Sequence, residues 1–267
     1  MGYWSHCEAG PLKVVILAGG FGTRLSEETE KTPKPLVEVG ENPILWHIMK
    51  HYMYYGFDDI IIALGYRGEA IKRYFMDYLN YRCNIKIDFS KAEVSVQDRL
   101  VEQWKLEMVD TGLNTLTGGR IKRLQPWLGK EAFMVTYGDG VSNINLRDLL
   151  ELHRSQGRIG TVTAVRPPAR FGGLVIDENI VVEFTEKPQV GEGWINGGFM
   201  VFEPAVFQYI EGDDVSLEVH VLERLAKDRQ LSVFKHEGFW QCVDTLRDLK
   251  LLNSLWNSGA PPWKIGD

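Results

Sequence analysis

The sequence contains no apolar run approaching the ~18 residues that a membrane-spanning helix requires. It has only three cysteines, Cys7, Cys83 and Cys242, which are widely spaced and include no C-x-x-C pair. Such a set fits a reducing compartment better than a disulfide framework. The opening "MGYWSHCEAGPLK" also lacks the apolar core of a signal peptide. We therefore expect a cytoplasmic protein in which residues 1–12 form a short extension before the folded domain.

Positive charge is not in excess, because 30 Lys and Arg stand against 36 Asp and Glu, giving a net charge of −6. Polyanions such as nucleic acids and acidic membranes do not attract a net anion, so neither is expected as a partner. The hydrophobic content of 44% is ordinary for a globular protein, and 267 residues are enough for one large α/β domain.

Two common nucleotide-binding motifs are also absent. The stretch "GFGTRL" begins like the dinucleotide-binding fingerprint, but Leu25 stands where that fingerprint needs its third glycine. The Walker A pattern G-x-x-x-x-G-K-[ST] does not occur. An NAD-dependent oxidoreductase and a P-loop ATPase are therefore disfavoured.

What the sequence does contain is an alternation of short apolar runs with amphipathic stretches, which is the pattern of βαβ units. Asn42 is expected to cap the first helix, with Pro43 in its first turn and Gly56 at its end. Strands are predicted at 14–17, 59–64, 84–89, 132–137 and 159–165, and helices at 42–56, 67–79, 145–157, 217–228 and 245–259.

From about residue 166 the predicted strands become shorter and are bounded by turns. We therefore expect an α/β fold with a mostly parallel, Rossmann-like nucleotide-binding sheet flanked by helices, followed by a smaller antiparallel β portion. Residues 13–267 would form a single domain, with the first part at about 13–165 and the second at about 166–267.

A glycine-rich turn, Gly19-Gly20-Phe21-Gly22-Thr23-Arg24, follows the first predicted strand. Glycines allow successive N–H groups to point into one concavity that binds anions, and the planar guanidinium of Arg24 suits phosphate oxygens. The alternative is a tight turn with a surface arginine. Lys34 follows between Pro33 and Pro35, whose fixed φ angles stiffen the backbone from which the ammonium extends.

Two aspartates follow apolar runs further along the chain. Asp139 lies in "GDG" directly after the predicted strand 132–137, and Asp244 follows "GFWQCV". Ligands of open α/β sheets bind beyond the carboxyl ends of the strands, so Asp139 and the glycine turn should share one edge. A carboxylate beside a triphosphate requires a hard cation such as Mg²⁺. The alternatives are an Asx turn for Asp139 and a helix N-cap for Asp244.

The stretch "LAGGFGTRLSEETEKTPKPLVEVGENPIL" resembles the signature of the sugar-nucleotide pyrophosphorylases, which are nucleotidylyltransferases acting on sugar 1-phosphates. The resemblance continues to about Lys264 through "VTYGDGVS" and "INGGFMVF". It implies catalytic roles for Arg24 and Lys34 and Mg²⁺ ligation by Asp139 and Asp244. The implied nucleotide-binding residues are Leu17, Ala18, Gly19, Gly20, Gly22, Thr23, Thr115, Arg120 and Gly138, and the implied sugar-phosphate-binding residues are Glu186, Lys187, Asn196 and Gly197.

Within that family, the chain most resembles the members that transfer a cytidylyl group from CTP to glucose 1-phosphate. The segment from Thr111 to Arg120 lacks the glutamine-containing motif with which thymidylyl and uridylyl relatives read the base. The resemblance implies Mg²⁺-assisted in-line attack that gives CDP-sugar and pyrophosphate. UTP or dTTP, another sugar 1-phosphate, or a catalytically silent regulatory relative are the alternatives. The aromatic content of 11% favours a homo-oligomer.

One segment departs from this resemblance. Cytidylyl-transferring relatives typically read W-E-x-E-P where this chain has Leu217-Glu218-Val219-His220-Val221. If that segment lines the sugar pocket, the identity of the sugar is open; if it packs a helix, the substitutions carry no such consequence.

Overall fold

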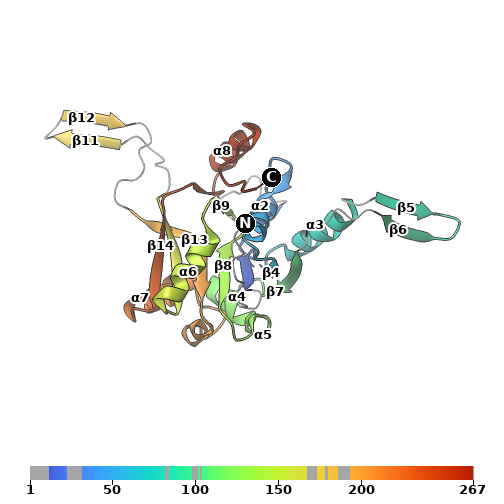
Figure 1. The fold of residues 1–267 in the computed structure, drawn as a ribbon, viewed down its shortest axis with the longest axis horizontal. Coiled ribbons are helices and arrows are strands. Elements are labelled where there is room, and N and C mark those ends of the chain that lie inside the picture. The colour runs from blue at the N-terminus through green and yellow to red at the C-terminus, as the bar shows by residue number, and fades with distance from the viewer. Residues whose placement is uncertain are drawn as a thin grey trace, which may run out of the picture.

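The computed structural model describes residues 12–22, 32–81, 84–97, 102, 104–166, 173–177, 180–185 and 193–266. Its centre is a seven-stranded sheet in the order β14-β10-β13-β8-β1-β4-β7 (Figure 1). Only β13 opposes the common direction of the other strands in this sheet. The strands are β1 (Lys13–Leu17), β4 (Asp59–Leu64), β7 (Lys105–Asp110), β8 (Phe133–Tyr137), β10 (Gly160–Val165), β13 (Ile195–Phe202) and β14 (Leu231–His236).

Helices and small ladders surround this sheet. The α-helices are α2 (Ile44–Tyr54), α3 (Gly68–Tyr81), α4 (Thr117–Arg123), α5 (Gln125–Leu128), α6 (Leu146–Gln156), α7 (Glu223–Lys227) and α8 (Leu246–Asn257). There are also two 3-10 helices, η2 (Lys34–Leu36) and η3 (Pro204–Tyr209), and a π-helix, η4 (Leu217–Leu222). The two-stranded ladders are β2 (Glu38–Val39) with β3 (Asn42–Pro43), β5 (Asn84–Asp88) with β6 (Glu93–Gln97), β9 (Gly140–Ser142) with β15 (Trp240–Cys242), and β11 (Gly173–Asp177) with β12 (Ile180–Thr185). No helix in these ranges is long and apolar enough to cross a membrane.

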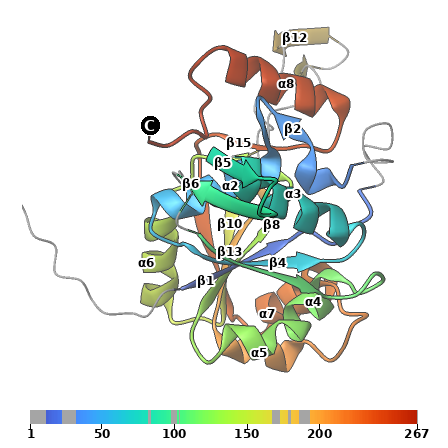
Figure 2. The same cartoon turned by 90° about the vertical axis from the view of Figure 1, so that its right-hand side faces the viewer.

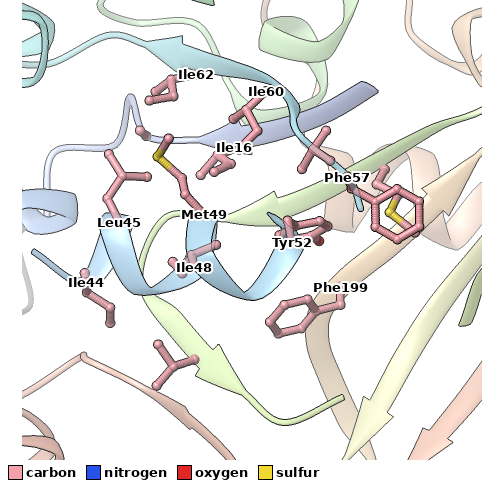
Figure 3. Close-up of a cluster of buried hydrophobic side chains, with 14 of the residues drawn as sticks. Ile16, Ile44, Leu45, Ile48, Met49, Tyr52, Phe57, Ile60, Ile62 and Phe199 are labelled. Atoms are coloured by element: carbon pink, nitrogen blue, oxygen red, sulfur yellow. The ribbon is translucent and has the colours of Figure 1, made fainter. Parts of the chain in front are cut away.

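Strand β1 is apolar on both faces because the sheet is covered on both sides. Val14 and Ile16 pack against α2, α3 and α8, in the cluster that Figure 3 shows around Met49 and Tyr52. Val15 and Leu17 point the other way, into a second cluster with α4, α5 and α7. Figure 2 shows these two groups of helices above and below the sheet. Burial of alternate side chains on opposite faces fixes the strand in register.

The carboxyl ends of β1 and β8 lie side by side at the point where the strand order reverses. Parallel pairing aligns Leu17 with Tyr137, while β4 continues the sheet on the other side of β1. The Gly138 N–H donates to the Leu17 carbonyl at 3.0 Å, so the loops after both strands begin at the same level. Such a switch point is where open α/β sheets bind their ligands.

The predicted mostly parallel α/β fold is confirmed; one local prediction is wrong, and another, the strand at 84–89, is right in type but lies elsewhere than in the main sheet. Asn42 does not cap the first helix; it pairs with Val39 in the β2–β3 ladder, so α2 begins at Ile44 with Pro43 at its cap. The predicted strand 84–89 lies outside the central sheet, in a hairpin with β6 that extends away from the body (Figure 1). The edge strands β7 and β14 were not predicted, because their half-exposed residues lack a continuous apolar run.

His51 on α2 is buried, and neither of its ring nitrogens has a hydrogen-bond partner in the described part of the chain. Burial lowers its pKa to about 4; the backbone of Ile144 raises it slightly and the neighbouring His236 lowers it further. The folded state therefore binds a proton on His51 less readily than the unfolded chain does, in which the pKa is about 6.5. The stability that depends on a neutral His51 is complete above pH 6.5 and declines toward pH 4.

We expect the urea midpoint of the protein to decrease when the pH is lowered from 7 to 5. His51 should account for up to about 2 kcal/mol of the accompanying loss of unfolding free energy. His51→Leu should flatten this part of the pH dependence because the leucine cannot titrate. His220→Gln, which changes an exposed histidine, is the control and should retain the wild-type slope. Equal slopes for His51→Leu and the wild type would contradict the assignment.

Candidate active site

A cavity of about 450 Å³ opens at the switch point between β1 and β8. It is lined by Leu17, Ala18, Gly19, Gly20, Phe21, Gly22, Lys34, Pro35, Leu113, Asn114, Thr115, Leu116, Thr117, Arg120, Tyr137, Gly138, Asp139 and Asp244. These segments lie far apart in the sequence and meet because the loops that follow parallel strands share one edge. The structure thus brings together the predicted glycine turn, the lysine and both aspartates.

Lys34 lies between the two predicted metal-binding aspartates. Its Nζ donates to Asp139 Oδ2 at 2.5 Å and to Asp244 Oδ1 at 2.7 Å. Pro33, at φ −61°, precedes the short turn η2, and Pro35 is buried against the start of the Gly138 loop. The ammonium therefore leaves a backbone segment that the two prolines hold in place.

The charges at this point are only slightly exposed to solvent, with 13% of the Lys34 side chain accessible. Burial by itself lowers the pKa of Lys34, but the two carboxylates outweigh it and hold the pKa above its ordinary value. Lys34 is thus a permanent cation, and the two carboxylates converge on one point where a positive charge is favoured.

The β9–β15 ladder brings Asp139 and Asp244 together. Cys242 pairs with Gly140, and the Val243 N–H donates to the Asp139 carbonyl at 2.9 Å. Asp244 is not the helix cap, since Thr245 caps α8 in a capping box with Asp248. The carboxylate of Asp244 is directed to Lys34 instead.

The free thiol of Cys242 lies in the same place, with its Sγ 3.7 Å from Asp244 Oδ2. Burial, followed by the charges of Asp244 and Asp139, raises the pKa of this thiol to about 12. The thiol therefore stays protonated at neutral pH and is a poor nucleophile. This agrees with a site that works by positioning charges.

Arg120 holds the floor of the cavity. Its Nη2 donates to the Gly19 carbonyl at 2.9 Å, and its Nη1 donates to the Leu64 carbonyl at 2.9 Å and the Gly112 carbonyl at 2.7 Å. The residue is 4% exposed, and among the described residues no carboxylate pairs with it directly. The guanidinium thus ties the ends of β1, β4 and β7 and leaves a buried positive charge beneath the glycine turn. Its contact with a nucleotide stays a prediction.

Asn196, Gly197 and Gly198 lie in strand β13, beside Tyr137. The φ of Gly198 is +81°, and a Cβ there would lie 2.5 Å from the Tyr137 ring, so the backbone packs directly on the ring. The Trp240 indole donates to the Gly197 carbonyl at 2.7 Å. Asn196 Oδ1 accepts from the Gly198 N–H at 3.0 Å, which fixes its side chain.

Four of the predicted site residues, Thr23, Arg24, Glu186 and Lys187, lie outside the described residues. Asn196 and Gly197 are described but do not line the cavity; Asn196 is linked to it through the Tyr137 hydroxyl. All other predicted site residues line the cavity itself. Sequence reasoning missed Tyr137 and Glu218. The position of Tyr137 directly before Gly138-Asp139 was a usable signal, whereas its pairing with a residue 81 positions away was not.

The segment 217–221, which departs from the cytidylyl-transferring pattern, forms a helix that packs into the core. Leu217 and Val221 are fully buried in the second core cluster, away from the cavity. Val219 and His220 are exposed, and His220 Nδ1 accepts from the Ser216 N–H at 2.9 Å. Of these five residues only Glu218 reaches toward the cavity wall, through Thr117 and Tyr137.

A glycine turn above a buried guanidinium, with a lysine and two carboxylates at the switch point of a parallel sheet, is an arrangement that suits a phosphate-bearing ligand in an α/β protein. The chain belongs to the nucleotidyl transferase family, whose model matches residues 13–255. It is 45% identical over 254 residues to the glucose-1-phosphate cytidylyltransferase of Salmonella typhi, covering 95% of this chain and 99% of that protein.

More distant relatives carry other names. The chain is 34% identical over 245 residues to the mannose-1-phosphate guanyltransferase of Hypocrea jecorina, which covers 89% of this chain and 62% of that longer protein. The crystal structure of HddC from Yersinia pseudotuberculosis complexed with GMP-PN superposes with a TM-score of 0.67 at 24% identity. That superposition covers 92% of this chain and 99% of the HddC chain, and it supports the fold alone.

Two adjacent glycines of the turn should respond differently to a methyl group. A Cβ on Gly19 would lie 2.3 Å from Arg120 Nη1, whereas a Cβ on Gly20 meets nothing within 4 Å. We expect Gly19→Ala to lose about 1–3 kcal/mol of unfolding free energy, since the buried guanidinium must move. Gly20→Ala is the matched control and should stay within about 0.5 kcal/mol of the wild type. Equal urea midpoints for the two variants would contradict the close packing of the Arg120 guanidinium against Gly19.

Proposed function

We propose that the protein transfers a cytidylyl group from CTP to a sugar 1-phosphate, with α-D-glucose 1-phosphate as the first candidate, and releases CDP-sugar and pyrophosphate. The observation that carries the proposal is the convergence of Lys34, Asp139 and Asp244 on one point beside the glycine turn. The 45% identity to a glucose-1-phosphate cytidylyltransferase along nearly the whole of both chains supports the choice of base and sugar.

In this reaction a phosphate oxygen of the sugar 1-phosphate attacks the α-phosphorus of CTP in line. A new oxygen–phosphorus bond forms as the bond between the α-phosphorus and the bridging oxygen breaks, and the electron pair leaves with pyrophosphate. The attacking phosphate is already anionic, so the site must supply position and positive charge more than a base. Arg24 and the glycine amides would stabilise the pyrophosphate, Lys34 the reacting phosphate, and Lys187 would direct the attacking group.

We further propose that Asp139 and Asp244 hold Mg²⁺. The residues fit this ion because two hard carboxylate ligands already converge on a single cation, the Lys34 ammonium. The described residues contain no cluster of three or more His, Cys, Asp or Glu side chains that could bind a metal without further ligands, so the substrate phosphates and water would have to complete the coordination. Two carboxylates completed by phosphate oxygens and water are what Mg²⁺ commonly uses. Bound there, Mg²⁺ would neutralise charge on the phosphates.

A homo-oligomer is also proposed, supported by the β5–β6 hairpin. Ile85 and Ile87 share one face of the hairpin with Val94, which pairs directly with Ile87, and all three are exposed. Two-stranded hairpins are marginally stable alone, so this face gains stability when it is covered. Light scattering of the purified protein tests the proposal, and a monomer at micromolar concentration would reject it.

The function is tested by measuring pyrophosphate release from the purified protein with CTP, UTP, dTTP, GTP and ATP, each crossed with a panel of sugar 1-phosphates. We expect CTP with glucose 1-phosphate to give the highest kcat/KM. A preference for UTP, dTTP or GTP would reject the assigned base, and a preference for another hexose phosphate would reject the sugar. Absence of release with every pair would favour a catalytically silent relative.

Asp139→Asn should lower kcat by about 100-fold or more, because the amide keeps the shape of the carboxylate but not its charge. The protein should still fold, since the substitution is isosteric and Asp244 continues to pair with Lys34. Asp214→Asn, at an exposed position outside the cavity, is the matched control and should keep wild-type turnover. Near wild-type pyrophosphate release from Asp139→Asn at saturating Mg²⁺ would contradict the proposal that Asp139 binds Mg²⁺.

A further inference from the structure

Glu218 is a half-buried carboxylate that accepts hydrogen bonds from three hydroxyl groups and from its own backbone N–H. Its Oε1 accepts from the Tyr137 hydroxyl at 2.5 Å, and its Oε2 accepts from the hydroxyls of Thr117 and Ser216, each at 2.7 Å. Among the described residues no lysine or arginine forms an ion pair with it. Burial by itself raises the pKa of Glu218, but the hydrogen bonds from the three hydroxyls and the backbone N–H outweigh it and hold the pKa below its ordinary value. The group is therefore an ionised acceptor at neutral pH.

Glu218 does not line the cavity, but Thr117 and Tyr137, which donate to it, both do. Tyr137 is the last residue of β8, directly before the loop that carries Asp139, and Thr117 is the first residue of α4. The carboxylate thus lies behind the wall and joins two of its elements. Its effect on a ligand must pass through the groups that it orients.

The hydrogen bonds of this wall have a fixed direction. A carboxylate can only accept, so the single O–H of Tyr137 is committed to Glu218 and its oxygen presents lone pairs on the other side. Asn196 Nδ2 lies 3.5 Å from the same hydroxyl oxygen, while Asn196 Oδ1 accepts from the Gly198 N–H. Asn196 therefore donates to Tyr137, and Tyr137 donates to Glu218. Because its single O–H is already used, the Tyr137 oxygen can only accept a hydrogen bond from a ligand.

We propose that Glu218 is a positioning residue that sets which hydrogen-bonding groups the Tyr137–Asn196 wall offers to the acceptor sugar. This rests on the proposed transfer to a sugar 1-phosphate: a sugar hydroxyl can donate or accept, and an acceptor-only phenol oxygen requires the hydroxyl beside it to donate. In the segment 217–221, which otherwise departs from the cytidylyl-transferring pattern, Glu218 is the residue with an influence on the sugar.

The decisive variant is Glu218→Gln. The glutamine amide has one accepting oxygen and one donating nitrogen, so with its oxygen on Thr117 and Ser216 it presents N–H groups to Tyr137. The phenol must then accept from the amide and turn its own O–H toward the cavity, where a sugar hydroxyl has met an acceptor. We expect KM for the sugar 1-phosphate to rise by about tenfold, since the sugar hydroxyl must reverse the direction of this hydrogen bond and reorient. KM for the nucleotide should stay within about twofold, because the glycine turn is unchanged.

Three controls separate this role from a structural one. Glu223→Gln, at an exposed position on the next helix, should leave both KM values and the melting temperature unchanged. Tyr137→Phe should raise KM for the sugar 1-phosphate by a similar factor, and the double variant should be no worse than either single one, since Glu218 acts through Tyr137. Glu218→Asp, which keeps the charge and an acceptor, should be less impaired than Glu218→Gln.

The outcomes distinguish the two proposals. A wild-type protein that releases no pyrophosphate with any pair removes the proposed function. An active wild type with an unchanged sugar KM in Glu218→Gln overturns only the role of Glu218, and so does an equal rise in both KM values. Additive effects of Glu218→Gln and Tyr137→Phe would also overturn it, because they would show independent action.

Discussion

The contact of one ammonium with two carboxylates is the interaction on which the rest of the site depends. Lys34 comes from the segment that follows β1, Asp139 from the loop after β8, and Asp244 from the end of β15. Three pieces of chain meet there, and each contributes a charge that would be unfavourable alone in a largely buried place. The stiff backbone around Lys34 and the β9–β15 ladder meet that requirement by fixing the partners before any ligand arrives.

Beneath this contact lies a second buried cation of a different kind. Arg120 is held by carbonyl groups, and its guanidinium excludes a side chain from Gly19 and from Gly65. Gly19 and Gly65 are therefore required by the arginine itself, independently of any ligand. A buried charge whose nearest partners are dipoles leaves a positive potential under the turn, which suits an anionic ligand.

The wall of the cavity that Tyr137 forms is held by hydrogen bonds and not by ion pairs. Tyr137 is packed beneath the Gly198 backbone and donates to Glu218, so its position and its direction are both fixed. Burial followed by the Glu218 charge raises the pKa of the phenol, which stays protonated. The replaced residues Leu217 and Val221 serve the core of the second cluster, so the departure from the cytidylyl-transferring pattern does not reach the cavity.

Local sequence determined much of this protein. The apolar run of β1, the glycine turn, the prolines around Lys34 and the left-handed Gly157 that ends α6 are all decided within a few residues, by sterics and by the burial of alternating side chains. The same local rules failed at Asn42, where pairing with Val39 outcompeted a helix cap. They also failed at the hairpin 84–97, whose separation from the central sheet no local pattern specifies.

Tertiary structure decided which of the predicted groups meet. Asp244 could have been a helix cap by its sequence, and only the capping box of Thr245 with Asp248 and the β9–β15 pairing turn its carboxylate toward Lys34. Glu218 and Tyr137 are 81 residues apart, and nothing in either neighbourhood predicts their contact. Sequence fixes the chemistry that each segment carries because backbone and side-chain preferences are local. The alignment of parallel strand ends decides the partners, because that alignment is set by the packing of the whole sheet.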